Sequence, residues 1–363
     1  MKEMKTSLVS IMMPAYNAER YIALAIESVL AQSYPEWELV VVNDGSSDAT
    51  AEIVAGYSDP RIKLIHQENS GEATARNTAL DHMQGELVAF LDADDQYFPG
   101  HLELTVGYLN KHPDKGGVYT DGYHYDQNGR LMKSLSSRRR GPYEGWVFEQ
   151  VVRASDVFGP PVCLVLRHRP IDEHELRFDR RIVIGPDWDF TTRYAQYAEF
   201  GYLDEFTCLY RVHPTNISFR TNKSKKLESL ALCREKTVQL PGFTRLSLET
   251  RQYVFYDLLI DLLAGRPERQ VEITQLPQFL ALPVEQRAIL FRLMASQAIL
   301  QRTDKHYPIE WLCQSLELNP LDWRAASLYR MYRLSPELCR VALRIKGLME
   351  LKRSSSLPFG DLK

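Results

Sequence analysis

The sequence predicts an α/β fold in which a mostly parallel central sheet, flanked by helices, is followed by an all-helical region. Three observations support this prediction. Short apolar runs alternate with helical apolar spacing through the first hundred residues, polar clusters follow the apolar runs directly, and strand-like runs cease after about Ser224. Alternating strands and helices are what a parallel sheet with right-handed crossovers requires, so we expect one such sheet in the first half.

Apolar runs and helical patterns alternate regularly in this half. The expected strands are Leu8–Met13, Trp37–Val42, Ile62–Ile65 and Leu87–Leu91. The expected helices are Ala18–Ala31, Ala49–Tyr57 and Glu72–Met83. The fourth apolar run has almost no polar position, which is typical of a strand that is buried on both faces of its sheet.

The second half of the sequence has a different character. Helical patterns separated by Pro and Gly occur at about 225–239, 248–264, 284–302, 308–317, 321–333 and 335–352. We therefore expect a sheet domain over residues 1–222 and a C-terminal helical domain over residues 223–363.

Composition and charge exclude several classes of protein. The 363 residues include 44 Lys and Arg against 47 Asp and Glu, and the net charge of −3 excludes a globally basic nucleic-acid-binding protein. No apolar run approaches the roughly 20 residues that a membrane-spanning helix needs. The five cysteines are widely spaced without a Cys-x-x-Cys pair, so we expect reduced thiols, a cytoplasmic location and no structural zinc site.

Three polar clusters follow expected strands directly, namely Pro14–Asn17, Asn43–Ser46 and Asp92–Asp95. In open α/β sheets the ligand binds beyond the carboxyl ends of the strands, so their joint position indicates a binding site rather than three unrelated turns. The carboxylates of the last cluster repel one another unless a cation lies between them, and they suit Mg²⁺ or Mn²⁺ carrying a substrate diphosphate. Asp44 can accept a hydrogen bond from the imide of a base, and Tyr16 can border that base.

These residues carry a family resemblance. In order and spacing, four segments resemble family 2 of the glycosyltransferases, which has the GT-A fold. They are Val9–Asn17, Val41–Asp48, Ala75–Asn77 and Phe90–Asp95. The resemblance implies an inverting enzyme that uses a nucleotide sugar. It also implies that residues 1–100 form a nucleotide-binding half of the domain and residues 101–222 an acceptor half.

The resemblance also implies roles for single residues on the donor side. Asp44 would bind the uracil or thymine imide, Asp92 would face the ribose, and Asp94 would hold Mn²⁺ or Mg²⁺ on the diphosphate. His213 would approach the diphosphate or the metal, with a structural role as the alternative. The residues expected to bind the nucleotide sugar are Pro14, Ala15, Tyr16, Glu19, Asp44, Arg76, Asp92, Ala93, Asp94 and Arg211.

The resemblance continues in the acceptor half, over the segments Val162–Arg167, Phe178–Asp179, Gly185–Phe190 and Tyr210–His213. Asp187 matches the aspartate that serves the family as general base, whereas Pro186 stands where the family usually has Glu. Proline fixes φ and lacks an N–H, so this difference bears on the geometry of the loop. The structural alternative for Asp187 is a helix N-cap. Asp189 is the rival base, and helical geometry turns it about 200° away from Asp187.

The expected reaction is a single displacement at the anomeric carbon with inversion. Asp187 would take the proton of the acceptor hydroxyl, and the metal, helped by Arg76, Arg211 or His213, would stabilise the leaving diphosphate. We expect a UDP-linked donor, a glycan or lipid-linked saccharide as acceptor, and no nucleic-acid partner. The alternative is a catalytically silent nucleotide-sugar-binding or scaffold protein, which Pro186 alone favours.

Two basic segments lie outside these motifs. Lys133–Arg140 is expected to be a solvated loop, with a patch for an anionic glycan or lipid phosphate as the alternative. The amphipathic stretch Cys339–Leu351 either packs against neighbouring helices or lies on an anionic membrane surface, at the inner face of the cell membrane. A homodimer through the C-terminal helices is a further expectation from their apolar stripes.

Overall fold

The computed structural model describes residues 6–354 and the side chains of residues 6–346. The chain forms two compact units that divide between Gly242 and Phe243, which is later than the boundary after residue 222 expected from the sequence. Helix α9 (Lys223–Val238) belongs to the first unit, where its Ser229 hydroxyl accepts hydrogen bonds from the backbone N–H groups of residues 183 and 184. Residues 355–363 lie outside the described residues, and so do the side chains of residues 347–351 in the amphipathic stretch Cys339–Leu351 that was expected to pack on helices or lie on a membrane.

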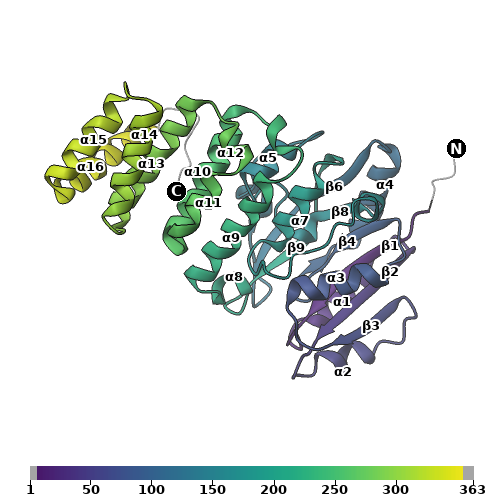
Figure 1. The fold of residues 1–363 in the computed structure, drawn as a ribbon. Coiled ribbons are helices and arrows are strands. Elements are labelled where there is room, and N and C mark those ends of the chain that lie inside the picture. Colours follow the sequence, from purple (N-terminus) through teal and green to yellow (C-terminus); the bar gives the residue numbers. More distant parts are fainter. Residues whose placement is uncertain (1–5, 355–363) are drawn as a thin grey trace. The chain divides into compact units, whose positions relative to one another are not determined.

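Nine strands in the described part of the first unit form one sheet (Figure 1). Their order is β3-β2-β1-β4-β8-β6-β9-β5, with β7 paired to β6. The strands are β1 (Val9–Ala15), β2 (Trp37–Asp44), β3 (Ile62–Gln67), β4 (Leu87–Phe90), β5 (Gln96–Tyr97), β6 (Lys115–Asp126), β7 (Leu131–Ser134), β8 (Leu164–Arg167) and β9 (Glu199–Val212). The predicted α/β class is confirmed, and β1 to β4 pair in parallel.

Beyond β4 the sheet is mixed. β8 runs antiparallel to both β4 and β6, and β5 runs antiparallel to β9. β9, the last strand of the described chain, lies between β6 and β5 and is parallel to β6. The carboxyl ends of β4 and β9 consequently belong to one sheet although more than a hundred residues separate them.

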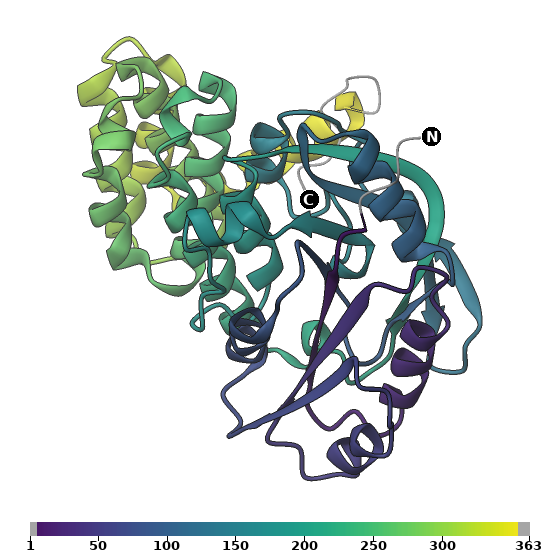
Figure 2. The ribbon, with the colours of Figure 1, turned by 90° about the vertical axis from the view of Figure 1, so that its right-hand side faces the viewer.

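Helices cover both faces of the parallel strands. Helices α1 and α4 bury apolar side chains against the face that carries Val9, Ile11 and Met13. Helix α3 contacts β1 and β2 from the opposite side (Figure 2). The helices of this unit are α1 (Ile22–Leu30), α2 (Thr50–Ala55), α3 (Glu72–His82), α4 (His101–Lys111), α5 (Phe148–Arg153), α6 (Arg169–Glu173), α7 (Pro186–Tyr194), α8 (Ile217–Arg220) and α9, with short 3₁₀ turns at η1 (Leu135–Ser137) and η2 (Pro161–Cys163).

The second unit is helical throughout its described residues, as the sequence predicts. Its elements are η3 (Phe243–Arg245), α10 (Leu248–Gly265), η4 (Pro267–Arg269), α11 (Gln270–Thr274), α12 (Pro277–Leu280), α13 (Val284–Gln301), α14 (His306–Leu318), α15 (Trp323–Leu334) and α16 (Pro336–Ser354). Helix α13 packs against α10, α14 and α16, and α15 contacts α14 and α16. Among the described helices, none combines the length and apolar character needed to cross a membrane.

Candidate active site

Asp44 ends β2 and organises the turn that leads into α3. Its Oδ1 accepts hydrogen bonds from Gln67 Nε2 at 2.6 Å and from the backbone N–H of Ser70 at 2.8 Å. Its Oδ2 accepts one from the N–H of Gly71 at 2.9 Å. A carboxylate oxygen has two lone pairs, so Oδ2 retains the capacity to accept a hydrogen bond from a base.

The loop that follows β1 is tied to the loop that follows β2. Asn17 has a positive φ of 48°, and its Oδ1 accepts a hydrogen bond from the N–H of Ser47. Glu19 Oε2 accepts one from the N–H of Ala49, so its carboxylate supports the start of α2. The Tyr16 side chain is 54% exposed and is accessible to a ligand. The remaining residues expected in the nucleoside pocket end β1: Pro14 and Ala15.

Arg76 on α3 joins two carboxylates. Its Nη2 lies 2.8 Å from Glu72 Oε1 and 2.8 Å from Asp92 Oδ1, and the residue is only 1% exposed. The charges of Glu72, Asp92 and Asp187 raise the pKa of this guanidinium, although burial acts in the opposite direction. The predicted site residues Arg76, Asp92 and Asp187 therefore share one charged cluster with Glu72, which the sequence analysis did not select.

His213 and Asp94 form a pair at the carboxyl ends of β9 and β4. His213 Nε2 lies 2.7 Å from Asp94 Oδ2, and Nδ1 lies 2.7 Å from the Thr215 hydroxyl. A carboxylate only accepts hydrogen bonds, so at this distance Nε2 carries a proton that it donates to Asp94, and Nδ1 accepts one from the Thr215 hydroxyl. For Nε2 to bind a metal beside the carboxylate, the ring proton has to move to Nδ1, which would then donate to Thr215. An imidazole nitrogen next to a carboxylate oxygen suits Mn²⁺ better than Mg²⁺, whose usual ligands are oxygen atoms.

The two residues would be a minimal protein ligand set. In the described part of the chain no three His, Cys, Asp or Glu side chains are grouped as a metal centre. The remaining ligands of an ion held at Asp94 and His213 would have to come from water and from a substrate diphosphate, which is a common arrangement for hard divalent ions.

Arg211 lies behind this pair and supports it. Its Nε donates a hydrogen bond to the Asp94 carbonyl oxygen, and its guanidinium lies 4.3 Å from the Tyr21 ring and 4.1 Å from the Tyr125 ring. The buried carboxylate of Asp95 also accepts a hydrogen bond from the backbone N–H of Arg211 at 2.8 Å. These contacts favour a positioning role for Arg211, which was expected at the nucleotide, because it orients the Asp94 backbone from a buried place.

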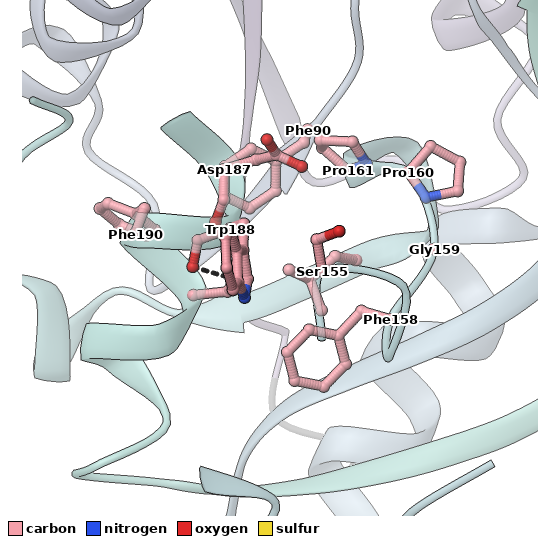
Figure 3. Close-up of a pocket in the computed structure, with 11 residues that line it drawn as sticks. Phe90, Ser155, Phe158, Gly159, Pro160, Pro161, Asp187, Trp188 and Phe190 are labelled. Carbon is pink, nitrogen blue, oxygen red and sulfur yellow. Dashed lines mark hydrogen bonds between the residues drawn. The ribbon is translucent and has the colours of Figure 1, made fainter. Parts of the chain in front are cut away.

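Asp187 lies in the wall of a cavity at the amino end of α7 (Figure 3). Pro186 occupies the first position of that helix, where a fixed φ suits the turn and no N–H is needed. Burial raises the pKa of the Asp187 carboxyl, while the Arg76 charge and the backbone N–H groups at the helix start partly offset this. A carboxylate with a raised pKa is a better proton acceptor than an exposed one.

Asp189, the rival base, has its carboxylate occupied elsewhere. Its Oδ2 lies 2.7 Å from Arg193 Nη2 and 2.8 Å from Lys236 Nζ of α9. Lys236 also pairs with Asp179 at 3.0 Å. The Asp189 side chain is buried in this ion-pair network, which ties α7 to α9, and it does not line the cavity that contains Asp187.

The basic segment 133–140 is anchored at its carboxyl end. Arg139 Nη2 donates to the Thr120 carbonyl oxygen at 2.7 Å, and its guanidinium lies 5.1 Å from the Tyr119 ring. Arg140 pairs with Asp156 at 3.1 Å. The expectation of a solvated loop is therefore incorrect for Arg139, whose guanidinium lies against Gly159 in the cavity wall, whereas Arg140 is exposed.

Two features of the site were absent from the sequence analysis. Glu72 stands four residues before Arg76 in a predicted helix, and this spacing is a signal for an ion pair that was available in the sequence. The segment Ser155–Pro161 carries no motif, and its position beside Asp187 depends on strands that the apolar pattern does not indicate.

Comparison with known proteins shows to which family the chain belongs. The family model described as Glycosyl transferase family 2 matches residues 10–174. The putative glycosyltransferase EpsH of Bacillus subtilis (strain 168) is 31% identical over 241 residues, which make up 63% of this chain and 68% of that protein. The chain belongs to glycosyl transferase family 2. The resemblance carried by the motif segments is thereby confirmed.

Another relative matches with higher identity over a shorter region. The Escherichia coli protein named UDP-Glc:alpha-D-GlcNAc-diphosphoundecaprenol beta-1,3-glucosyltransferase WfgD is 50% identical over 105 residues, which are 29% of this chain and 42% of that protein. The chain thus spans less than half of the length of this relative.

Solved structures share the fold of this family 2 chain. The S. aureus TarS 1-349 complex with UDP-GlcNAc has a TM-score of 0.56 at 19% identity, covering 89% of this chain and 92% of that one. The mannosyltransferase PcManGT from Pyrobaculum calidifontis, in complex with GDP-Man and Mn2+, has a TM-score of 0.51 at 21% identity, covering 89% and 87% of the two chains. The GT-A fold expected from the motifs is confirmed.

Proposed function

We propose that this chain is an inverting glycosyltransferase that moves a sugar from a UDP-linked donor to a hydroxyl group of a glycan or lipid-linked saccharide. Membership of family 2 supports the reaction class. The complex of TarS with UDP-GlcNAc supports a UDP-linked donor. The name of WfgD, which specifies a diphosphoundecaprenol-linked acceptor, supports a lipid-linked saccharide.

The observation that carries the proposal is the environment of Asp187. This carboxylate lines a cavity, its pKa is raised by burial, and it shares a charged cluster with Arg76 and Asp92. In the mechanism that we propose, Asp187 accepts the proton of the acceptor hydroxyl while that oxygen attacks the anomeric carbon. The donor's bond to the diphosphate breaks on the opposite face of the sugar, which inverts the anomeric configuration.

The leaving diphosphate requires compensation of its charge. We assign Mn²⁺, with Mg²⁺ as the alternative, to Asp94 and His213, and such an ion would neutralise part of that charge. Arg211 holds the Asp94 backbone in position, and Asp44 with Tyr16 would hold the base. The complex of PcManGT with Mn2+ supports a metal of this kind in the fold.

A catalytically silent nucleotide-sugar-binding protein was the alternative, and Pro186 was its support. Proline at the first position of α7 fits the helix without distortion, and Asp187 follows it into the cavity wall. The silent alternative therefore has no further observation in its favour.

The decisive experiment replaces Asp187 by Asn, which has nearly the same shape but cannot take the proton. We expect Asp187→Asn to bind UDP as the unaltered protein does and to lower sugar transfer by roughly 10²-fold or more, measured as UDP release in the presence of acceptor. The control is Asp172→Asn, at an exposed carboxylate on α6. Undiminished transfer by Asp187→Asn would exclude Asp187 as the base.

A further inference from the structure

The cavity beside Asp187 has an unusual lining for a sugar-binding site. The space between its lining residues amounts to about 360 Å³ together with open solvent, so the cavity proper is small and has room for no more than a small group. Its polar side chains are Asp187, Ser155 and Thr191, and the rest of its wall is apolar or glycine: Phe90, Phe158, Gly159, Pro160, Pro161, Leu164, Trp188 and Phe190. Figure 3 shows Asp187, Trp188 and Phe190 on one side of this space and Ser155, Phe158 and the two prolines on the other.

The apolar wall is held in place from behind. The Phe158 ring lies 4.4 Å from Phe200 and packs edge-to-face on Tyr119, and the Trp188 indole N–H donates to the Val151 carbonyl oxygen at 2.7 Å. A Cβ atom on Gly159 would come within 3.0 Å of Arg139 Nη2, which shows how closely that arginine backs the wall. The cavity is consequently preformed and does not need a ligand to shape it.

The charge of the cavity restricts its occupant. Asp187 contributes a carboxylate and no Lys, Arg or His side chain lines the described cavity, so a uronate or a phosphate group would meet the Asp187 charge with no cation in direct contact. The Thr191 hydroxyl already donates to the Asp187 carbonyl oxygen at 2.8 Å. Ser155 is exposed at the edge of the cavity, and its hydroxyl can form a hydrogen bond with a polar atom of the ligand. The lining thus fits a small apolar group attached to one amide or hydroxyl.

We propose that the acceptor sugar is uncharged and carries an acetamido group beside its reactive hydroxyl, with the acetamido methyl in this cavity and the amide at Ser155. The inference rests on the proposed function, because Asp187 as base brings the reactive hydroxyl against the same wall. An acetamido group has both required parts: a methyl to bury between aromatic rings and a polar amide that can pair with Ser155. A 6-deoxy sugar offers the methyl without the amide, and it serves as a comparison.

Binding can be measured without turnover, on protein saturated with UDP and Mn²⁺. The probes are the methyl glycosides of N-acetylglucosamine, glucose, a 6-deoxyhexose and glucuronic acid. We expect the N-acetylglucosaminide to bind about fivefold more tightly than the glucoside because one methyl group is buried, and the glucuronide to bind least. In saturation-transfer NMR with irradiation of aromatic protons, the acetamido methyl should receive the strongest transfer. Equal affinities for all four glycosides would overturn the inference.

The variant Ser155→Leu fills the mouth of the cavity from an exposed position, so folding should be unaffected. It should abolish the preference for the N-acetylglucosaminide and leave UDP affinity unchanged, while Ser58→Leu, at an exposed serine after α2, should change neither. A preference that survives in Ser155→Leu would refute the assignment to this cavity.

Two further results separate the proposals from each other. The ratio of the affinities for UDP-GlcNAc and UDP-Glc should be the same in the wild type and in Ser155→Leu. If the two donors bind differently to the wild type but equally to the variant, the cavity binds the donor sugar and the acceptor assignment is wrong. A wild-type preference for the N-acetylglucosaminide without any sugar transfer would support the cavity while counting against the proposed function.

Discussion

Among single residues, Glu72 has an unusual electrostatic environment that the proposed reaction does not use. Burial is the main cause that raises the pKa of its carboxyl to about 7, and the neighbouring charges of Asp92, Asp187 and Asp94 add to the effect while Arg76 opposes it. Above this pH the cluster around Arg76 holds an additional negative charge. The folded protein therefore retains a proton on Glu72 over a range in which an unfolded chain, with an ordinary glutamate pKa of 4.5, has released it.

This shift predicts a pH dependence of stability. Between pH 4.5 and about 7 the folded state binds more protons at Glu72 than the unfolded state, so the contribution of this residue to stability decreases as pH rises. In Glu72→Gln the side chain cannot ionise. The difference in free energy of unfolding, variant minus unaltered protein, should therefore increase from pH 4.5 to 7.5. Urea unfolding at several pH values measures the difference. Glu52→Gln, on the exposed side of α2, should show no such trend, and a flat difference for Glu72→Gln would contradict the raised pKa.

The metal assignment predicts how UDP binding responds to chelation. UDP should bind more weakly when Mn²⁺ is removed, because the acidic cluster repels a bare diphosphate, and Asp94→Asn should lose most of this response in calorimetry. Thr215→Val removes the partner of His213 Nδ1 and should weaken Mn²⁺ binding by roughly 10- to 100-fold without touching the ion. Identical UDP affinity in chelator and in Mn²⁺ would refute a metal at Asp94.

Between elements, the contact of α7 with α9 depends on a buried ion-pair network. Asp189 is 3% exposed and serves both Arg193 and Lys236. Asp189→Ala should destabilise the first unit by about 3 kcal/mol, because Arg193 loses its carboxylate partner and Lys236 loses one of its two in a mostly buried place. Urea unfolding measures this loss, and Asp172→Ala at an exposed carboxylate is the control. A loss below about 0.5 kcal/mol would show that the network is solvated like an ordinary surface pair.

The elements differ in how far the sequence could predict them. Strands β1, β2 and β4 were predicted because buried parallel strands are nearly continuous apolar runs, whereas β3 was predicted from a shorter run of half-buried residues at the edge of the sheet. β6 was missed because Gly116, Gly117 and Gly122 interrupt its pattern, yet these glycines are required by close packing: a Cβ atom on Gly122 would lie 2.3 Å from the Cys208 carbonyl oxygen. The motifs located the acidic residues of the site, whereas its apolar wall depends on tertiary contacts of Phe158 and Arg139 that no local pattern encodes.

For the whole chain, the division into two units after Gly242 predicts where it can be shortened. A protein ending at residue 242 retains Ser229 and Lys236, which bind the segment around α7, and it should keep UDP affinity and a cooperative unfolding transition. A protein ending at residue 226, near the boundary expected from sequence, lacks both and should unfold at lower temperature. Calorimetric melting of the two proteins distinguishes these outcomes, and equal melting temperatures would show that α9 contributes nothing to the first unit.

The role that we propose for the helical unit is placement of the acceptor or self-association. The 242-residue protein should then lose transfer to the natural acceptor, or change its oligomeric state in analytical ultracentrifugation, while UDP binding persists. Full transfer activity with an unchanged sedimentation coefficient would refute this role. Flotation with anionic liposomes, with and without residues 334–363, tests the membrane contact expected for the basic tail.

The position of β9 between β6 and β5 has a consequence for biosynthesis. A ribosome delivers Asp94 long before it delivers His213, and β9, which ends directly before His213, must enter a sheet whose neighbouring strands have already been made. Domains can begin to fold during translation. Strands β1 to β4 can therefore assemble on the nascent chain before Asp94 has met His213. The growing polypeptide should therefore acquire a nucleoside-binding surface first, and the ability to retain a divalent ion only after β9 has left the exit tunnel.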